Sequence, residues 1–378
     1  MPLKKDTGVG ATTASSVESI NKAFHVMELN NIYLEKQDAK ERGKDIIQEA
    51  KRIVKGPRHS AMSVSQSEAL SKTASELSLD DELTFMVGVW NLVIGTHRTM
   101  KDMDVHDKLV FVETAWEKDD LKCNWGSPFA ANLTPPLRFA DPEMEAFADW
   151  IPKLKNSVPD LTYGYRKSTF TPEQMDANEV VKGEICRRNW HPFLIVEAKS
   201  IDLPFGQGVA QALRAAAATI NLKRKLVEEA KPTVNADIST TQQHSADSST
   251  STLKHETTSA VPNPNNGILE PTSGQNRYKS DMFSFIFTFV ICPDLARLFV
   301  AWAEEAWSGN NNNEPGINYH MHVLQHYYFS DGGDAWAAIH HDLDNVLDWG
   351  VGSRKTQVLN LLNDVANKKK DGKKRART

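Results

Sequence analysis

The stretch HPFLIVEAKS, residues 191–200, decides how this chain is expected to fold. Its side chains from Pro192 to Val196 are apolar, yet a carboxylate at Glu197 and an ammonium at Lys199 follow them. Because alternate side chains of a strand point to the same face, the two charges stand side by side at the end of a strand that the sequence predicts to be buried. Charges at such a place are costly, so the pair needs a reason.

The tripeptide Glu-x-Lys carries little information by itself, since about one is expected by chance in a chain this long. The chain has the same letters twice more, at Glu49-Ala50-Lys51 and Glu229-Ala230-Lys231, in polar segments of helical character where charges face water. Of the three copies, Glu197-Ala198-Lys199 is the one that ends an apolar strand.

A second carboxylate and a polar helix stripe accompany the pair. Asp160 follows Pro159 at the start of another extended segment, so it can stand beside Glu197 if the two strands are neighbours. The segment 205–230 is a long helix by its alanine, leucine and lysine content. At three- and four-residue steps it carries a stripe that would look back over the strand ends, made of Gln207, Gln211, Arg214 and Ala218.

The order Asp, Glu-x-Lys and then Gln on the next helix resembles the PD-(D/E)XK nuclease superfamily, here through Pro159-Asp160 and Glu197-Ala198-Lys199. The segments PDLTYGY, PFLIVEAKS and QALRAAAA are similar in sequence to the fungal nuclease-like families of that group. The resemblance covers about 105–225, extends over 280–365 and does not include the first hundred residues. It implies a restriction-endonuclease-like α/β fold.

The resemblance also implies roles. Asp160, Glu197 and Ala198 would bind Mg²⁺, with Mn²⁺ as a substitute, Lys199 would help to activate water, and Gln211 would complete the site. The chemistry suits these residue types, because magnesium takes hard oxygen ligands and leaves positions for water and a phosphate oxygen. An ammonium beside the metal can orient the nucleophile and stabilise developing negative charge.

A further acid is implied on an earlier helix, where VETAWEKD at 112–119 resembles the E-x-x-W pattern of the fungal group through Glu113 and Trp116. Glu117 shares that face and is a rival, and either acid can simply face solvent. The 37-residue separation of Asp160 and Glu197 departs from the superfamily, which leaves the pairing of their strands open.

Each candidate also has a structural interpretation. Asp160 can cap a turn after Pro159, and Glu197 with Lys199 can be a surface ion pair of little energetic value. Gln211 can be an ordinary residue of a helix surface. The order of these residues along the chain favours the functional interpretation.

The fold class predicted is α/β, with a mixed central sheet of four to five strands flanked by helices. Residues 1–100 form a helical N-terminal region whose first 15 or so residues are disordered, 101–367 form the nuclease-like domain, and 368–378 form a basic tail. Residues 231–276 are rich in Ser, Thr, Asn and Pro and are expected to be a disordered insertion in that domain. Strands are expected at 161–170, 192–199, 281–292, 295–303 and 319–329, and helices at 16–55 (two), 65–77, 80–96, 104–118, 142–155, 205–230, 334–349 and 353–367.

The segment 319–329 would place His320, His322 and His326 on one strand face with Leu324 and Tyr328. His-x-His on a strand can bind a transition metal, but a half-buried strand with amphipathic rings is the favoured interpretation. His340 and His341 are expected on a helix surface.

Composition sets outer limits. The net charge of -5 gives no global attraction to nucleic acid, so binding requires a local basic patch. The three separated cysteines fit thiols in a reducing compartment, and the apolar runs are too short for a membrane span, so an intracellular protein is expected. The seven basic residues from Lys368 to Arg377 are interpreted as a nuclear targeting signal, with a phosphate-contacting arm or a solvated terminus as alternatives.

The function predicted is a Mg²⁺-dependent phosphodiesterase that acts on nucleic acid, with DNA favoured over RNA and no membrane partner. One alternative is a nuclease-like domain that binds nucleic acid or protein without cleavage, since a fold does not guarantee chemistry. Another is a helical interaction module whose α/β part is a scaffold. Oligomeric state, sequence preference and endo or exo action do not follow from the sequence.

Overall fold

The structure is a computed structural model that describes residues 11–57, 62–78, 121–125, 151–154, 158–182, 184–186, 189–200, 203–231, 285–306 and 316–375, with positions 85, 88–90, 93 and 129. Residues 1–231 and 280–378 form one compact unit, to which every described element belongs. The expected insertion, apart from Lys231, lies outside the described residues, as do the helix expected at 104–118 and most of those expected at 80–96 and 142–155.

A mixed sheet forms the centre of this unit, so the α/β class is as predicted. The path of the sheet runs β1-β8-β7-β6-β5-β3-β2, and β4 pairs separately with β5. The pairs β1–β8 and β5–β6 are parallel and the others are antiparallel. The strands are β1 (Ile32–Leu34), β2 (Leu121–Trp125), β3 (Leu161–Tyr165), β4 (Glu184–Cys186), β5 (Asn189–Ala198), β6 (Ile286–Ile291), β7 (Leu295–Ala306) and β8 (Gly316–Tyr328).

The sheet is therefore larger than the four or five strands expected. Strands β1 and β4 have three residues each, too few for a hydrophobic period to show in the sequence. Strand β1 pairs with β8, so the N-terminal hundred residues are not all-helical and contribute an edge strand to the central sheet.

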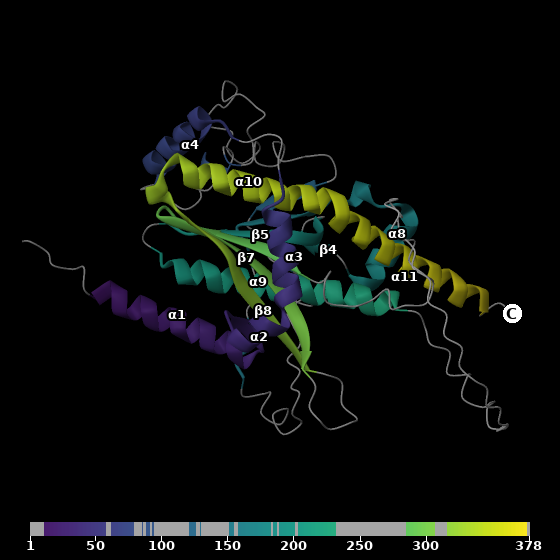
Figure 1. Ribbon diagram of the computed structural model, residues 1–378. Coiled ribbons are helices and arrows are strands. Elements are labelled where there is room, and N and C mark those ends of the chain that lie inside the picture. Colours follow the sequence, from purple (N-terminus) through teal and green to yellow (C-terminus); the bar gives the residue numbers. More distant parts are fainter. Residues whose placement is uncertain are drawn as a thin grey trace, which may run out of the picture. The chain divides into compact units, whose positions relative to one another are not determined.

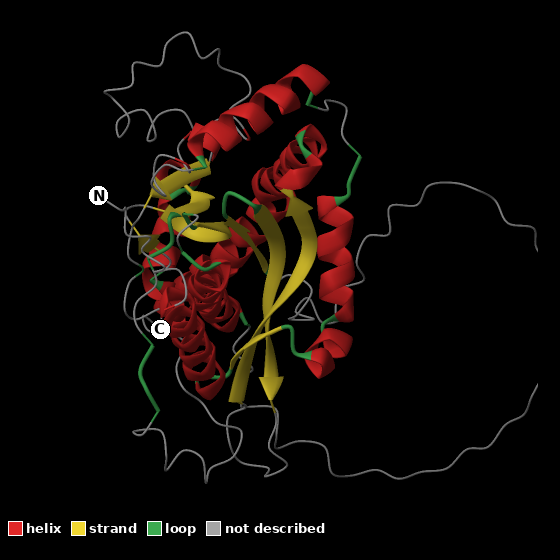
Figure 2. Cartoon of the chain, turned by 90° about the vertical axis from the view of Figure 1, so that its left-hand side faces the viewer, coloured by secondary structure: helices red, strands yellow, loops and turns green. Residues whose placement is uncertain are grey.

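Helices cover both faces of the sheet, as Figures 1 and 2 show. Side chains of α3, α4, α10 and α11 pack in one apolar layer, and those of α1 and α9 pack in the other. The helices are α1 (Ala11–Leu29), α2 (Gln37–Arg42), α3 (Lys44–Val54), α4 (Val64–Leu77), α8 (Pro172–Val181), α9 (Phe205–Ala230), α10 (Gly333–Trp349) and α11 (Lys355–Arg375), with the 3₁₀ helices η4 (Lys167–Thr169) and η6 (Phe329–Asp331) and the π-helical segment η7 (Gly350–Arg354).

The alternation of side chains along β5 explains the two layers. Ile195 packs with α9, while Leu194 and Val196 pack on the opposite side of the sheet. All ten residues of β5 are buried, as the apolar run predicts for a strand covered on both faces. The helix predicted at 205–230 is α9 with the same bounds, and α11 continues through the first part of the expected basic tail to Arg375.

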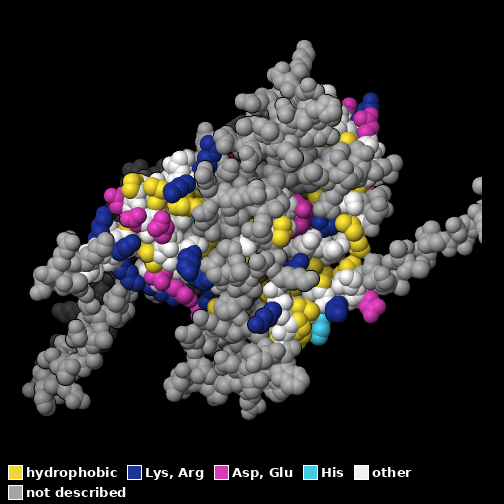
Figure 3. Space-filling model, turned by 180° about the vertical axis from the view of Figure 1, so that it is seen from behind, with side chains coloured by type: hydrophobic (Ala, Val, Ile, Leu, Met, Phe, Trp, Pro, Cys, Tyr) yellow, Lys and Arg dark blue, Asp and Glu magenta, His cyan; other side chains and the backbone are white. Residues whose placement is uncertain are grey.

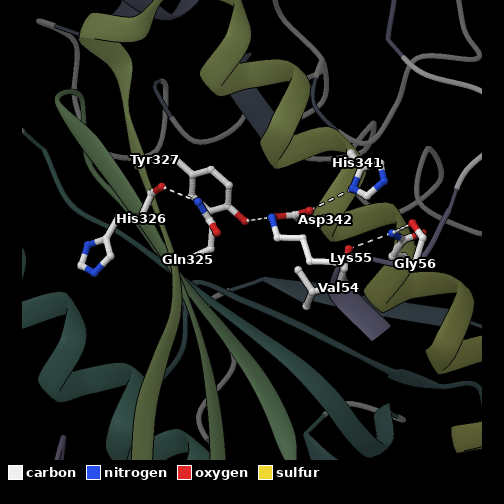
Figure 4. Close-up of polar contacts among 9 residues, drawn as sticks. Val54, Lys55, Gly56, Gln325, His326, Tyr327, His341 and Asp342 are labelled. Carbon is white, nitrogen blue, oxygen red and sulfur yellow. Dashed lines mark hydrogen bonds and ion pairs between the residues drawn. The ribbon is translucent and has the colours of Figure 1, made fainter. Parts of the chain in front are cut away.

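A buried carboxylate ties α3 and β8 to α10 (Figure 4). Asp342 accepts a hydrogen bond from the Tyr327 hydroxyl at 2.7 Å and pairs with the Lys55 ammonium at 2.9 Å. Its other oxygen lies 2.9 Å from Nδ1 of His341. Asn345, one turn along α10, donates to the main-chain oxygens at the end of α3. The partners satisfy Asp342, so we assign this cluster a structural role.

The prediction that His320, His322 and His326 share one face of the strand is wrong, because β8 pairs with β7 through a β-bulge at position 324. A bulge adds one residue to one strand and reverses which face the following side chains occupy. His320 and His322 are therefore buried, whereas His326 and Tyr328 are exposed.

The two buried histidines of β8 contact carboxylates. His320 Nε2 lies 3.0 Å from Oε1 of Glu304, and His322 Nδ1 lies 2.9 Å from Oε2 of Glu35. Burial raises the pKa of Glu304, but hydrogen bonds from His320 and Arg42 outweigh it and hold that pKa well below its usual range. The first contact joins β8 to β7, whose Glu304 also pairs with Arg42 of α2, and the second joins β8 to the residue that follows β1, so both histidines have a structural use.

Candidate functional site

The site lies where β3 begins and β5 ends. These strands are antiparallel neighbours, with Leu161 opposite Val196, so Asp160 stands one step beyond that pair, beside Glu197. The main-chain N–H of Ala198 donates to Oδ2 of Asp160 at 2.7 Å. Asp160 and Glu197 are thus adjacent in space although they are far apart in sequence, because α8 and β4 lie between β3 and β5 in the chain.

The ammonium of Lys199 lies among three oxygen atoms. Its Nζ is 3.6 Å from Oδ2 of Asp160 and 3.8 Å from Oε2 of Glu197, and it also donates to the main-chain oxygen of Ala198. The distance between Oδ2 of Asp160 and Oε2 of Glu197 therefore cannot exceed the sum of these two distances. One small cation already bridges both acids and the carbonyl between them.

Burial distinguishes this group from an ordinary ion pair. Glu197 is 1% exposed and Lys199 is 3% exposed, while the Asp160 side chain keeps 27% of its surface open. Asp160 is thus the side from which solvent or a ligand can reach the group. The surface ion pair considered from sequence is wrong for Glu197 and Lys199, because both are in the interior.

Helix α9 closes the site from the face opposite α10. A methyl group added at Gly208 would lie 3.0 Å from Cγ of Lys199 and 3.0 Å from Cγ1 of Val290, so the glycine lets α9 approach β5 and β6 closely. Arg214, two turns along, is half-buried. Burial lowers the pKa of Arg214, and the negative charge of Glu197 acts in the opposite direction, so the guanidinium lies within reach of this carboxylate's field.

Gln211 lies between these two positions on α9. It is partly buried, and its Oε1 finds no hydrogen-bond donor. Residues three or four positions apart share a helix face. Gln211 therefore lies on the same face of α9 as Gly208, which packs closely against Lys199, and Arg214, whose pKa is lowered by burial but pushed upward by the charge of Glu197. Of the expected polar stripe, Gln207 is exposed and Ala218 is buried.

The donor set fits a hard divalent cation. It offers two carboxylates and a main-chain carbonyl, all oxygen, and magnesium usually takes one or two protein carboxylates and keeps several waters. No group of three or more His, Cys, Asp and Glu side chains that could hold a metal occurs among the described residues.

The structure brings together Asp160, Glu197, Ala198 and Lys199, with Gln211 on the covering helix. Glu113 and its rival Glu117 lie outside the described residues. Sequence reasoning placed Arg214 on the stripe without a site role, and it missed Gly208. The small residues of FGQG at the start of the helix were the available signal for a close helix–strand contact.

Figure 3 shows the molecule from behind the view of Figure 1, with Lys and Arg side chains interspersed among acidic and apolar ones. The described residues thus form no broad single-sign basic area on this face. No described helix is long and apolar enough to cross a membrane. Comparisons of the chain with protein-family models, with curated proteins and with solved structures gave no match.

Proposed function

We propose that the chain is a Mg²⁺-dependent phosphodiesterase that cleaves nucleic acid, with DNA as the favoured substrate over RNA. The observation that carries the proposal is the placement of the Lys199 ammonium among oxygens of Asp160, Glu197 and Ala198. These are the three residues expected to bind the metal and the lysine expected to act beside it. A restriction-endonuclease-like arrangement of β3, β5 and α9 is part of the same proposal.

The charges of the site support this chemistry. Two carboxylates are balanced by Lys199 and Arg214, so a divalent cation and a phosphodiester can enter without leaving a large excess of either sign. A bound Mg²⁺ would lower the pKa of a water molecule and offset charge at the attacked phosphate. Asp160 and Glu197 would hold the cation, and Ala198 would add its carbonyl oxygen.

Lys199 has the role of a movable cation. If these oxygens held Mg²⁺, the ammonium of Lys199 would be free of them and could orient the attacking water and stabilise charge on the phosphate. Arg214 would contact the phosphate from α9, and the free Oε1 of Gln211 would accept a hydrogen bond from the water. The partly open Asp160 side is the entry for the substrate.

The test is cleavage of single- and double-stranded DNA and RNA in the presence of Mg²⁺, beside calorimetric titration of Mg²⁺. Wild-type chain is expected to bind Mg²⁺ and cut, and Glu197→Gln and Asp160→Asn are expected to lose both. The matched control is Glu229→Gln, which changes the same tripeptide where it lies exposed at the end of α9. A wild-type chain that neither binds Mg²⁺ nor cuts would leave the nuclease-like binding module as the better account.

The nuclear targeting role of the basic end is proposed on charge alone. The residues from Lys368 to Arg375 form the last turns of α11, and none of the side chains from 367 to 372 is buried. Removing 368–378 from a large fluorescent fusion should therefore shift it from nucleus to cytoplasm without loss of thermal stability. Nuclear accumulation that survives this truncation would exclude the targeting role.

A further inference from the structure

A second group of charges lies inside the same unit, at the other end of β5. It consists of Lys223 in the second half of α9, Arg354 at the end of η7, and His191 near the start of β5. His191 and Glu197 are six residues apart on the strand, which corresponds to about 20 Å. The group is therefore separate from the candidate nuclease site.

All three side chains are removed from solvent. Lys223 is 3% exposed and Arg354 is 1% exposed. Nζ of Lys223 and both Nε and Nη1 of Arg354 are buried without a hydrogen-bond acceptor. Among the residues that the structure describes, no carboxylate lies within ion-pair distance of either cation. A guanidinium remains charged in proteins, so Arg354 cannot avoid the cost of burial by losing a proton.

The neighbouring groups do not supply the missing acceptor. The Tyr165 hydroxyl donates to the main-chain oxygen of Gly350 at 2.7 Å, and Nε2 of His191 lies 2.6 Å from Oδ1 of Asn178. The Trp349 ring lies 6.0 Å from the guanidinium and offers only a weak contact. Burial is the main cause that lowers the pKa of His191 to about 3, and the positive charges of Arg354 and Lys223 act in the same direction.

We propose that Lys223 and Arg354 bind a phosphate-type oxyanion between α9, η7 and the start of β5. Nε and Nη1 of the guanidinium and Nζ of Lys223 are buried donors without an acceptor, and the oxygens of such an anion would supply acceptors and offset the positive charge. The oxyanion is either free phosphate or the phosphate group of a larger molecule. Neither source depends on the proposed nuclease activity.

The experiment measures the thermal midpoint of the full chain in phosphate and in chloride at equal ionic strength and pH. A ligand that binds only the folded state raises the midpoint in a saturable way. The wild type is expected to respond to phosphate, and Arg354→Met and Lys223→Met are each expected to bind phosphate at least about tenfold more weakly. Lys225→Met, a partly exposed lysine on the same helix, is the matched control and should respond like wild type.

Two comparisons make the assignment specific. Lys199→Met should keep the phosphate response, because the oxyanion binds at the other end of β5. A stronger response to a nucleoside monophosphate than to phosphate would identify the anion as part of a larger molecule, and an equal response would identify free phosphate. The proposal is overturned if phosphate stabilises the wild type no more than chloride does, or if Lys199→Met abolishes the response while Arg354→Met keeps it. Should either core variant fail to fold, calorimetric titration of phosphate into wild type and Lys225→Met decides whether one anion binds per chain.

Discussion

Under the proposed function, Lys199 would serve two states of the site, one without and one with the metal. Breaking a buried pair by removing one partner costs about 3–5 kcal/mol, since the remaining charge is left in a medium of low polarity. The ammonium lies close to Glu197 and Asp160, and under the proposed function a bound divalent cation would free it to act on the substrate. The lysine would therefore compete with the metal for the same oxygens.

This competition predicts that the Lys199→Met variant differs in kind from the carboxylate variants. It should bind Mg²⁺ at least as tightly as wild type, because no ammonium has to be displaced, yet it should lose cleavage by a factor of about 10² or more. Glu197→Gln should lose both, since hard cations need the anionic oxygen. Calorimetry and cleavage rates measure the two effects, and a Lys199→Met chain that cuts normally would remove the lysine from the mechanism.

His191 predicts how stability depends on pH. Its pKa in the folded chain is lowered to about 3 by burial and by the charges of Arg354 and Lys223, while an unfolded histidine titrates near pH 6.5. Below pH 6.5 the unfolded chain takes up a proton that the folded chain refuses, so stability is full above that pH and falls as the pH drops toward 3.

The loss from this one group at pH 4 amounts to about 3 kcal/mol. His191→Asn, which suits the positive φ of 49° at this position, should flatten the fall between pH 6.5 and 4. Denaturant unfolding of both chains across this range measures it, and parallel curves would contradict the assignment.

At the scale of elements, the contact of α9 with β5 and β6 fixes the position of Lys199. Alanine at Gly208 gains about 1 kcal/mol of helix propensity but forces an overpacked contact that typically costs about 1–3 kcal/mol. We expect Gly208→Ala to lower stability slightly and to lower cleavage more, because the lysine stem must shift. Gly206→Ala is the control, since its methyl group would meet Ile20 of α1 instead. Equal effects of the two variants on cleavage would show that the contact does not position Lys199.

Elements with a strong local signal could be predicted from the sequence. The apolar run of β5 and the composition of α9 predicted both closely, and the acid at Asp160 was placed beside Glu197 on the condition that their strands pair. The capping box of α8, in which Thr171 and Gln174 cap each other's main chain, was present in the sequence and overlooked.

Other features depend on distant partners and leave no local trace. Strand β1 has three residues and exists because β8 pairs with it. The bulge that divides the histidines of β8 arises from register with β7. The cations at Lys223 and Arg354 are 131 positions apart in the sequence, so nothing in either segment predicts that they share an interior.

At the scale of the whole molecule, the described elements on both sides of residues 232–279 build one sheet. Strand β5 precedes this segment and β6 follows it, yet the two are parallel neighbours with Glu197 opposite Val290. The compact unit formed by 1–231 and 280–378 therefore requires both flanks. A break of the chain that separated them would remove one wall of the candidate nuclease site.

Deleting 232–276 and joining the ends through a short Gly/Ser linker should leave the fold and the site intact. The segment is poor in large apolar side chains, so its composition offers little surface to bury, and shortening a flexible loop changes the closure cost only logarithmically, by about 0.6 kcal/mol for each halving. The expected thermal midpoint equals or slightly exceeds that of the full chain, with unchanged Mg²⁺ affinity. As a control, cutting further, through 285–291, should unfold the chain because it removes β6. A large drop in midpoint for the first deletion alone would mean that 232–276 packs against the unit and belongs to its structure.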